Sequence, residues 1–203
     1  MMKLFFSGTS PYARIARIAA SECGITHAGG HLASAQLRTD DNPVLEYNCT
    51  GRVPTLVDSD TVVTETRAVC RYLVNVGNGA KLFDYAGDWP AERFENTAMS
   101  FLDGCALWAR EHRRDKALQS DWLQGVEGKR AARCLDWFEA DPGIQSGNAP
   151  WDFAHMILFV ALDYQELRGL IADWRDGRPN LAQWHTAQLE RPSVVANGNI
   201  GDP

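Results

Sequence analysis

Residues 51–66 of the chain read GRVPTLVDSDTVVTET. Two short strand-forming runs, Thr55-Leu56-Val57 and Val62-Val63, flank the Asp58-Ser59-Asp60 turn. This pattern predicts a β-hairpin. A helix is expected directly afterwards, over residues 64–73, because apolar side chains recur there on one side.

The residues before this stretch complete a small domain. Residues 3–6 predict a first strand, and apolar residues at helical spacing up to Cys23 predict a helix that ends at Gly24. Residues 25–42 are polar and irregular, and Asn42-Pro43 favours a short helical turn. The order strand, helix, strand, hairpin, helix predicts an α/β domain over residues 1–76.

The chain after residue 76 has a different pattern. Residues 77–88 are rich in glycine and predict a linker. Residues 89–203 predict an all-helical domain with apolar periodicity around 94–108 and 122–138 and a last surface helix over 179–190. Residues 152–168 are apolar nearly all round, which is typical of a buried central helix.

Composition limits the partners. The 203 residues carry a formal net charge of -6, which argues against nucleic acid or an anionic membrane as the main partner. The five cysteines are scattered and odd in number, which favours reduced thiols in a cytoplasmic protein. The histidines show no metal-ligand spacing, so no metal is expected. The sequence Met1-Met2-Lys3 leads straight into a strand, without a secretory signal.

Val53-Pro54 is the first candidate binding element. It lies between a bend and a strand, where an X-Pro bond is often cis. A cis bond would turn the Val53 N–H and C=O outward, free to pair with an extended peptide. The alternative is an ordinary trans proline in a turn.

Glu65-Thr66 is the second candidate, at the start of the helix predicted after the hairpin. Backbone N–H groups and a hydroxyl at a helix N-terminus bind a carboxylate, and Glu65 can accept from an ammonium group of the same ligand. The alternative is a simple helix cap.

Ser10 is the third candidate, before Pro11 at the start of the first helix. A free thiol has a pKa of about 8.5, and a helix N-terminus and a hydrogen-bond donor both lower it. Ser10 Oγ can therefore donate to a bound sulfur and favour its thiolate. The alternative is a serine that only caps the helix.

Taken together, these motifs resemble the glutathione S-transferase family over essentially the whole chain. The matching segments are 10–17, 51–56, 65–73, 103–104, 154–168 and 191–193. The resemblance implies a thioredoxin-like N-terminal domain, an all-α C-terminal domain and a homodimer. Serine at position 10 implies the serine-type bacterial branch, and the family implies a cytoplasmic detoxification enzyme.

The resemblance also implies roles for individual residues. Ser10 would activate the thiol of glutathione, the co-substrate, and Val53 beside Pro54 would pair with its cysteinyl backbone. Glu65 and Thr66 would bind its γ-glutamyl end, and Arg52 lies next to that site. A small apolar electrophile would be the second substrate. Its cleft would be lined by Tyr12, Phe101 and Trp108, although helical spacing makes Phe101 and Trp108 core candidates as well.

Three positions depart from the family pattern. Thr66 replaces the usual serine and keeps the hydroxyl. Cys49 replaces the usual proline after Asn48, and a buried, unreactive thiol is expected there. Asp152 and His155 replace the Ser/Thr and Asp that normally open the buried helix. Asp152 is expected to cap this helix, with His155 donating back to it.

The sequence is compatible with three functions. The first is conjugation of the glutathione thiolate to small electrophiles. The second is glutathione-dependent isomerisation, reduction or dehalogenation on the same fold. The third is a non-catalytic interaction module that keeps the fold without turnover.

Overall fold

The structure is a computed structural model that describes residues 2–78 and 81–201. The chain divides into two compact units. The first runs up to Phe83 and takes in the chain from Arg191 onward, and the second is Asp84–Glu190. Among the described helices, none combines the length and apolar character needed to cross a bilayer.

The first unit is built on a mixed sheet with the strand order β2-β1-β3-β4. Its strands are β1 (Lys3–Phe6), β2 (Ala28–His31), β3 (Thr55–Asp58) and β4 (Thr61–Thr64). β1 runs parallel to β2 and antiparallel to β3, and β3 pairs with β4 in the predicted hairpin. The hairpin turn includes Ser59 at a φ of 52°.

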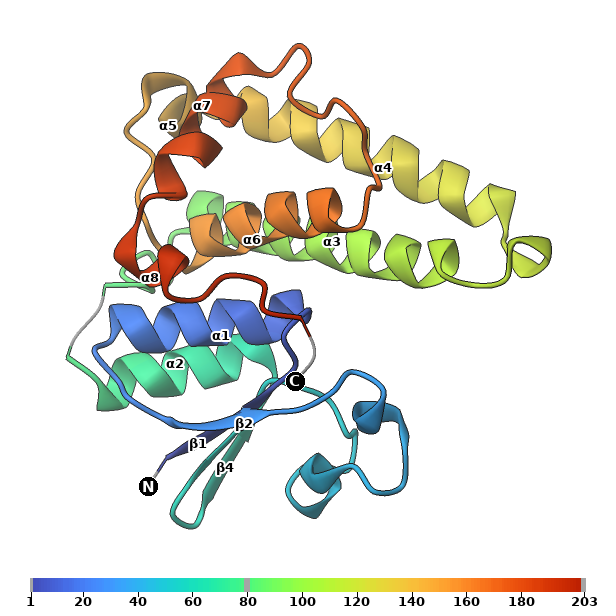
Figure 1. Cartoon of the computed structure of the whole chain (residues 1–203). Coiled ribbons are helices and arrows are strands. Elements are labelled where there is room, and N and C mark those ends of the chain that lie inside the picture. Colours follow the sequence, from blue (N-terminus) through green and yellow to red (C-terminus); the bar gives the residue numbers. More distant parts are fainter. Residues whose placement is uncertain (1, 79–80, 202–203) are drawn as a thin grey trace. The chain divides into compact units, whose positions relative to one another are not determined.

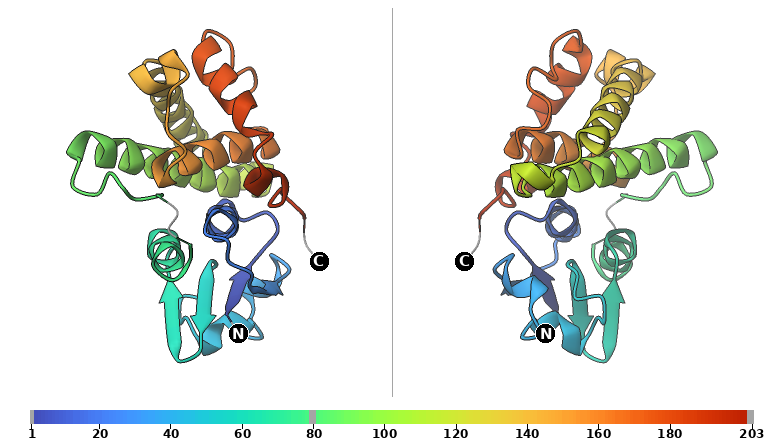
Figure 2. Two further views of the ribbon diagram at one scale, coloured as in Figure 1. Left: turned by 90° about the vertical axis from the view of Figure 1, so that its left-hand side faces the viewer. Right: turned by 90° about the vertical axis from the view of Figure 1, so that its right-hand side faces the viewer.

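Two helices pack side by side on one face of this sheet and run in the same direction (Figures 1 and 2). Helix α1 (Pro11–Glu22) starts with a proline, which suits a first helical position, and Gly24 follows its end at a φ of 65°. Helix α2 (Thr66–Val76) buries Val69, Cys70 and Leu73. These helices confirm the α/β domain.

The segment expected to be irregular, residues 25–42, contains β2. Its strand signal is weak because Gly29 and Gly30 have no side chain to pack. A Cβ on Gly30 would lie 3.0 Å from the Leu4 carbonyl oxygen, so the close approach to β1 explains a small residue there. Two short 3-10 turns follow, η1 (Gln36–Arg38) and η2 (Pro43–Glu46).

The described part of the second unit is helical, as expected. Its elements are α3 (Trp89–His112), η3 (Lys116–Leu118), α4 (Asp121–Glu139), α5 (Pro142–Ser146), α6 (Phe153–Leu167) and α7 (Pro179–Gln188). Helix α6 is buried over most of its length and packs against α3 (Figure 1). The prediction of a buried central helix is confirmed.

The N-terminus of α6 is capped as the sequence predicts. Asp152 Oδ1 accepts hydrogen bonds from the backbone N–H of His155 at 2.9 Å and from His155 Nδ1 at 2.7 Å. The His155 ring stacks on Phe94, with 4.4 Å between ring centroids. One carboxylate thus satisfies both a helix N–H and a buried imidazole.

The two compact units divide the chain differently from the expected domains. Helix α3 begins at Trp89, where the helical domain was expected to begin, but the chain from Arg191 onward belongs to the first unit rather than the second. The short helix α8 (Pro192–Val195) packs against α1. The few apolar side chains of α8 do not indicate, in the sequence, which of the two units this helix packs against. Residues 79 and 80 of the expected linker lie outside the described residues.

Candidate functional site

The strand register brings the three candidate motifs to one end of the sheet. Phe5 of β1 pairs with Thr55 of β3, and Thr55 pairs with Thr64 of β4. The turn after β1 leads to Ser10, Val53-Pro54 immediately precedes β3, and Glu65-Thr66 follows β4. Segments that are far apart in the sequence therefore meet at the ends of neighbouring strands.

Ser10 is half-buried and forms the N-cap of α1. Its Oγ accepts a hydrogen bond from the Ala13 N–H at 3.2 Å, and its own N–H donates to the Ser7 carbonyl at 3.1 Å. A hydroxyl has one donor and two acceptor sites, so this capping bond leaves the hydroxyl proton available. The first turn of α1 carries no acidic side chain that would compete for its positive end.

The Val53–Pro54 peptide bond is cis, as its position in the sequence favours. Pro54 is buried and Val53 is half-buried. Within the described part of the chain, neither the N–H nor the C=O of Val53 has a hydrogen-bond partner. Val53 thus presents one free donor and one free acceptor at the end of a central strand.

Arg52 precedes this peptide and has an exposed side chain. Its carbonyl oxygen accepts from Thr55 Oγ1 at 2.8 Å and from Asn48 Nδ2 at 3.3 Å. The backbone of Arg52 is therefore held from within the unit, while its guanidinium remains on the surface.

Asn48 holds the turn in place, a role that the sequence analysis missed. Its Nδ2 donates to Thr55 Oγ1 at 3.0 Å and to the Arg52 carbonyl, and its Oδ1 accepts from the N–H and Oγ1 of Thr50 at 3.0 and 2.8 Å. The sequence shows only a polar residue six positions before Pro54, and its 93% burial is seen in the structure alone. Cys49 is exposed, so the expectation of a buried thiol is wrong. Asn48 takes the interior position, and the next side chain points outward.

Glu65 and Thr66 open α2 in an unusual conformation. Glu65 has φ 68° and ψ 135°, a region that costs a non-glycine residue on the order of 1–3 kcal/mol. Its side chain makes no capping hydrogen bond, so the simple helix cap is not observed. Thr66 is buried, whereas the carboxylate of Glu65 is exposed.

These groups form a polar site whose parts differ in charge and in hydrogen-bonding type. An unpaired peptide N–H and C=O can bind another extended backbone. The uncapped N-terminus of α2 can bind an anion, and the adjacent carboxylate can bind a cation. The Ser10 hydroxyl at the start of α1 can donate to a second anion.

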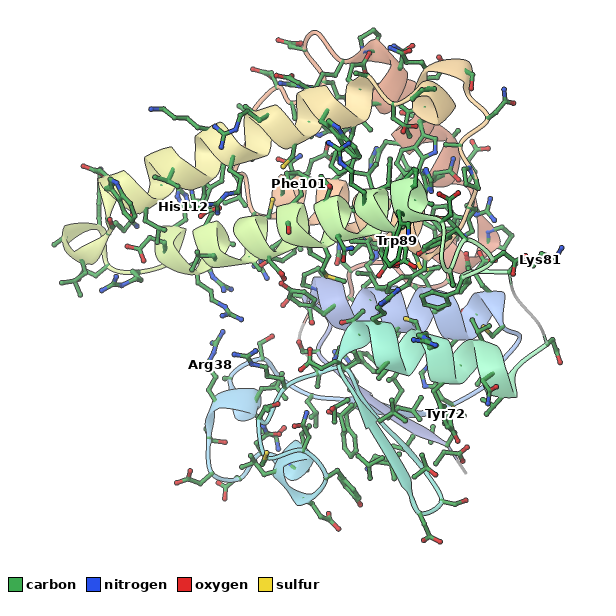
Figure 3. The ribbon with its side chains drawn as sticks, turned by 180° about the vertical axis from the view of Figure 1, so that it is seen from behind. Arg38, Tyr72, Lys81, Trp89, Phe101 and His112 are labelled. Atoms are coloured by element: carbon green, nitrogen blue, oxygen red, sulfur yellow. The ribbon has the colours of Figure 1, made fainter. Side chains whose placement is uncertain are left out.

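The residues proposed for a second-substrate cleft have individual environments. Tyr12 is half-buried in the first turn of α1. Phe101 is 2% exposed, and its ring centroid lies 6.1 Å from that of Phe138, so it is part of the core of the helical unit (Figure 3). Trp108 is half-buried against α4, where a Cβ on Gly128 would lie 3.3 Å from its ring. Their contact with a substrate stays a prediction.

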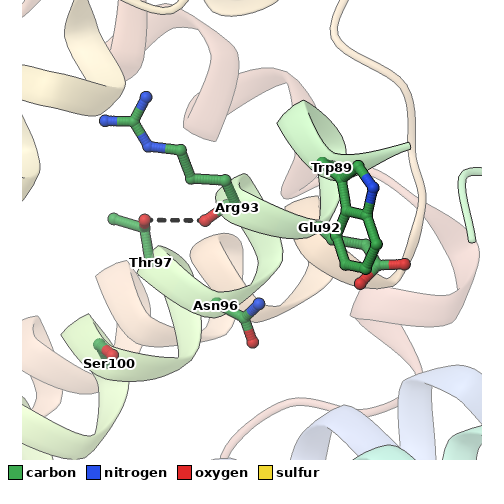
Figure 4. A pocket seen from close by; sticks show the side chains of 6 residues that line it. All are labelled: Trp89, Glu92, Arg93, Asn96, Thr97 and Ser100. Atoms are coloured by element: carbon green, nitrogen blue, oxygen red, sulfur yellow. Dashed lines mark hydrogen bonds between the residues drawn. The ribbon is translucent and has the colours of Figure 1, made fainter. Parts of the chain in front are cut away.

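The outer side of α3 has an open hollow with a volume of about 450 Å³ (Figure 4). It is lined by Trp89, Glu92, Arg93, Asn96, Thr97 and Ser100. These residues recur at three- and four-residue spacing and share one side of a single helix. The hydroxyl of Thr97 is used within the helix, because it donates to the Arg93 carbonyl at 2.8 Å.

Two buried cysteines, Cys23 and Cys105, have thiols whose pKa is raised above the usual value. Burial, with a smaller effect from Glu22, raises the pKa of Cys23 to about 11, and burial raises that of Cys105 to about 12. Both thiols are therefore protonated at neutral pH. Across residues 2–78 and 81–201, no cluster of three or more His, Cys, Asp or Glu side chains has the arrangement of a metal site.

Comparison with known proteins agrees with this architecture. Residues 9–76 match the family model described as the glutathione S-transferase N-terminal domain, and this range includes every motif at the candidate site. No curated protein sequence matches the chain significantly.

Solved structures match over nearly the whole chain. A glutathione S-transferase from Methylobacillus flagellatus KT with glutathione bound is 26% identical, with a TM-score of 0.87 over 98% of this chain and 100% of the other. A glutathione transferase family member from Pseudomonas fluorescens Pf-5 with bound glutathione is 24% identical, with a TM-score of 0.85 over 98% and 100%. A glutathione S-transferase from Methylobacterium radiotolerans in complex with glutathione sulfonate is 21% identical, with a TM-score of 0.84 over 100% and 96%.

The strand register, the motifs at the sheet end and these matches lead to the same assignment. Residues 9–76 match the glutathione S-transferase N-terminal domain, and the chain as a whole has the fold of the glutathione transferases to which it is similar.

Proposed function

We propose that this protein binds glutathione and transfers its thiolate to small apolar electrophiles. The observation that carries the proposal is the meeting of Ser10, Val53 and Glu65-Thr66 at one end of the sheet. Each offers a different group, and together they match the different parts of an extended γ-glutamyl tripeptide.

The backbone and the γ-glutamyl end of glutathione account for two of these elements. The cysteinyl backbone pairs with the free N–H and C=O of Val53 beside Pro54, in the manner of an added strand. The α-carboxylate binds at the N-terminus of α2 with Thr66, and the α-ammonium group binds the Glu65 carboxylate. Arg52 lies next to this end. The strained backbone of Glu65 supports a binding role, because strain of this kind is concentrated at functional sites.

The thiol then lies against Ser10. The Ser10 hydroxyl donates to the sulfur, and the positive end of α1 favours negative charge there, so both lower the thiol pKa. The thiolate attacks an electrophilic carbon, forming an S–C bond while a leaving group departs or the adduct takes a proton from water. Ser10 stabilises the anion and forms no covalent bond.

The similar structures support this assignment. The Methylobacillus flagellatus enzyme, 26% identical over nearly the whole chain, holds glutathione. Serine before Pro11 supports membership of the serine-type bacterial branch, and we propose a cytoplasmic homodimer that detoxifies electrophiles, as the resemblance to that branch implies. Conjugation is favoured over disulfide chemistry because position 10 carries serine instead of cysteine.

Calorimetric titration of glutathione into the full chain tests the proposal. The protein is expected to bind, and Glu65→Gln is expected to weaken binding about 10- to 100-fold, the effect of losing a hydrogen bond to a charged group. Asp60→Asn is the matched control, because it also removes one exposed carboxylate but lies in the hairpin turn at the opposite end of β3 and β4.

A folded protein that does not bind glutathione, even at low salt, would overturn this function and favour the non-catalytic interaction module. Binding without turnover of any electrophile would favour the same module, with glutathione as its ligand. Turnover without conjugate formation would favour isomerisation, reduction or dehalogenation.

A further inference from the structure

Residues 197–201, here called the strap, run from α1 to the turn that carries Ser10. At one end, Arg14 Nε donates to the Asn197 carbonyl at 2.9 Å and an Arg17 guanidinium nitrogen donates to the Gly198 carbonyl at 3.3 Å. Both arginines are more than 90% buried. Two guanidinium groups thus leave solvent to hold main-chain carbonyls of a segment distant in sequence.

The Asn197 side chain adds to this anchor. Its Nδ2 donates to Ser21 Oγ on α1 and to the Ser193 carbonyl, both at 2.8 Å. Asn197 is 8% exposed. Because its backbone and side chain both bond within the first unit, the start of the strap is fixed on α1.

The other end of the strap reaches the turn between β1 and α1. The Ile200 N–H donates to the Gly8 carbonyl at 3.4 Å. The Gly201 carbonyl lies 3.2 Å from His31 Nε2, and the His31 ring stacks on Phe6 with 4.9 Å between centroids. A Cβ on Gly8 would lie 1.6 Å from the Gly201 oxygen, so the strap passes directly against the Gly8 backbone.

Gly8 belongs to the four-residue turn that sets the position of Ser10. Within this turn the Ser10 N–H donates to the Ser7 carbonyl at 3.1 Å. On its other side, Thr9 Oγ1 is 3.3 Å from Ser34 Oγ, on the connection after β2. The turn is therefore held between the strap and that connection.

We propose that the strap positions Ser10: Arg14, Arg17 and the Ile200 N–H hold the Ser7–Ser10 turn so that the Ser10 hydroxyl points at the glutathione sulfur. The inference rests on the proposed function. A hydrogen bond to a thiolate loses strength steeply with distance and angle, so a turn free to move would stabilise the anion less. These residues act through the turn and touch no reacting atom.

Substitution of Ile200 separates the backbone contact from the side chain. Ile200→Pro removes the N–H that bonds to Gly8, and Ile200→Ala keeps it. The side chain is 50% exposed, so neither change disturbs a core. Hydrogen exchange of the Ser10 and Ala13 amides, measured without glutathione, is expected to become about fivefold faster in Ile200→Pro, the effect of one lost hydrogen bond. Ile200→Ala should exchange like the unmodified protein.

Kinetics with glutathione give the second readout. Ile200→Pro should raise the pKa of the bound thiol and lower kcat while the KM for glutathione stays unchanged, because Val53, Glu65 and Thr66 are not touched. Gly8→Ala, whose Cβ displaces the strap, should do the same. Unchanged exchange and unchanged thiol pKa in Ile200→Pro, or equal effects of the proline and alanine variants, would overturn the positioning role. Failure of the unmodified protein to bind glutathione would instead overturn the proposed function, whatever the exchange result.

Discussion

Replacing Asn48 by alanine should weaken both the turn before Pro54 and the binding of glutathione. The change removes four hydrogen bonds, two donated by Nδ2 and two accepted by Oδ1. Thr50 is exposed, so water can replace the two bonds that Asn48 accepts from it. The bonds to Thr55 and to the Arg52 carbonyl are shielded, and each contributes about 1 kcal/mol, which gives a loss of about 2 kcal/mol.

The assay must report on the first unit alone. All seven tryptophans lie between Trp89 and Trp184, in the second unit, so their fluorescence does not report on this turn. Hydrogen exchange of the β3 amides gives the local opening free energy, and calorimetry gives glutathione affinity. We expect an opening free energy lower by about 2 kcal/mol and affinity reduced about tenfold or more, because Val53 is no longer fixed.

Two variants identify the bonds that matter. Asn48→Asp keeps the acceptor oxygen but loses both Nδ2 donors, so it should cost about as much as Asn48→Ala. Thr50→Val removes one bond at the exposed side and should cost less than about 0.5 kcal/mol. Unchanged glutathione binding in Asn48→Ala, or a loss of stability in Thr50→Val as large as that in Asn48→Ala, would contradict this role of Asn48.

Three further outcomes are expected. Glu65→Gly should be about 1 kcal/mol more stable to urea than Glu65→Ala, because glycine tolerates a positive φ. Both variants should lose the same amount of glutathione affinity. Equal stabilities of the two variants would contradict backbone strain at Glu65. A thiol reagent at pH 8 should modify Cys49 within minutes and leave Cys105 unmodified, as peptide mass mapping would show. Slow modification of Cys49 would mean that its thiol is buried. Asp152→Ala should lower the free energy of unfolding by about 2–4 kcal/mol, because the α6 cap and the His155 partner are lost together, and Asp152→Asn by less than half as much; equal losses would contradict the shared acceptor.

Much of the fold follows from local sequence signals. The hairpin around Asp58-Ser59-Asp60 is predictable because a polar turn separates two strand-forming runs, and the buried helix at 152–168 is predictable because its residues are apolar nearly all round. The glycine-rich strand β2 is not, since parallel pairing with β1 supplies what its side chains lack. The place of the chain after Arg191 depends on hydrogen bonds from Arg14 and Arg17 to carbonyls, which leave no pattern in the sequence.

The residues of the candidate site also differ in how far the sequence reveals them. Ser10, Pro54 and Thr66 are recognisable because residue type and position beside a strand or helix end limit what each can do. Asn48 is not recognisable as the residue that holds the turn, because its partners Arg52 and Thr55 become neighbours only after the loop closes. The role of a side chain that holds the backbone of other residues can be seen only in the structure.

The most direct test is the pKa of the glutathione thiol on the protein, measured by the ultraviolet absorbance of the thiolate at saturating glutathione. The bound thiol should titrate below the free value of about 8.5, and Ser10→Thr, which keeps the hydroxyl, should titrate close to the unmodified protein. Ser10→Ala should titrate about 1–2 units higher, equivalent to one hydrogen bond to a charged sulfur, with turnover reduced accordingly. A thiol pKa that is the same with serine and alanine at position 10 would contradict the account.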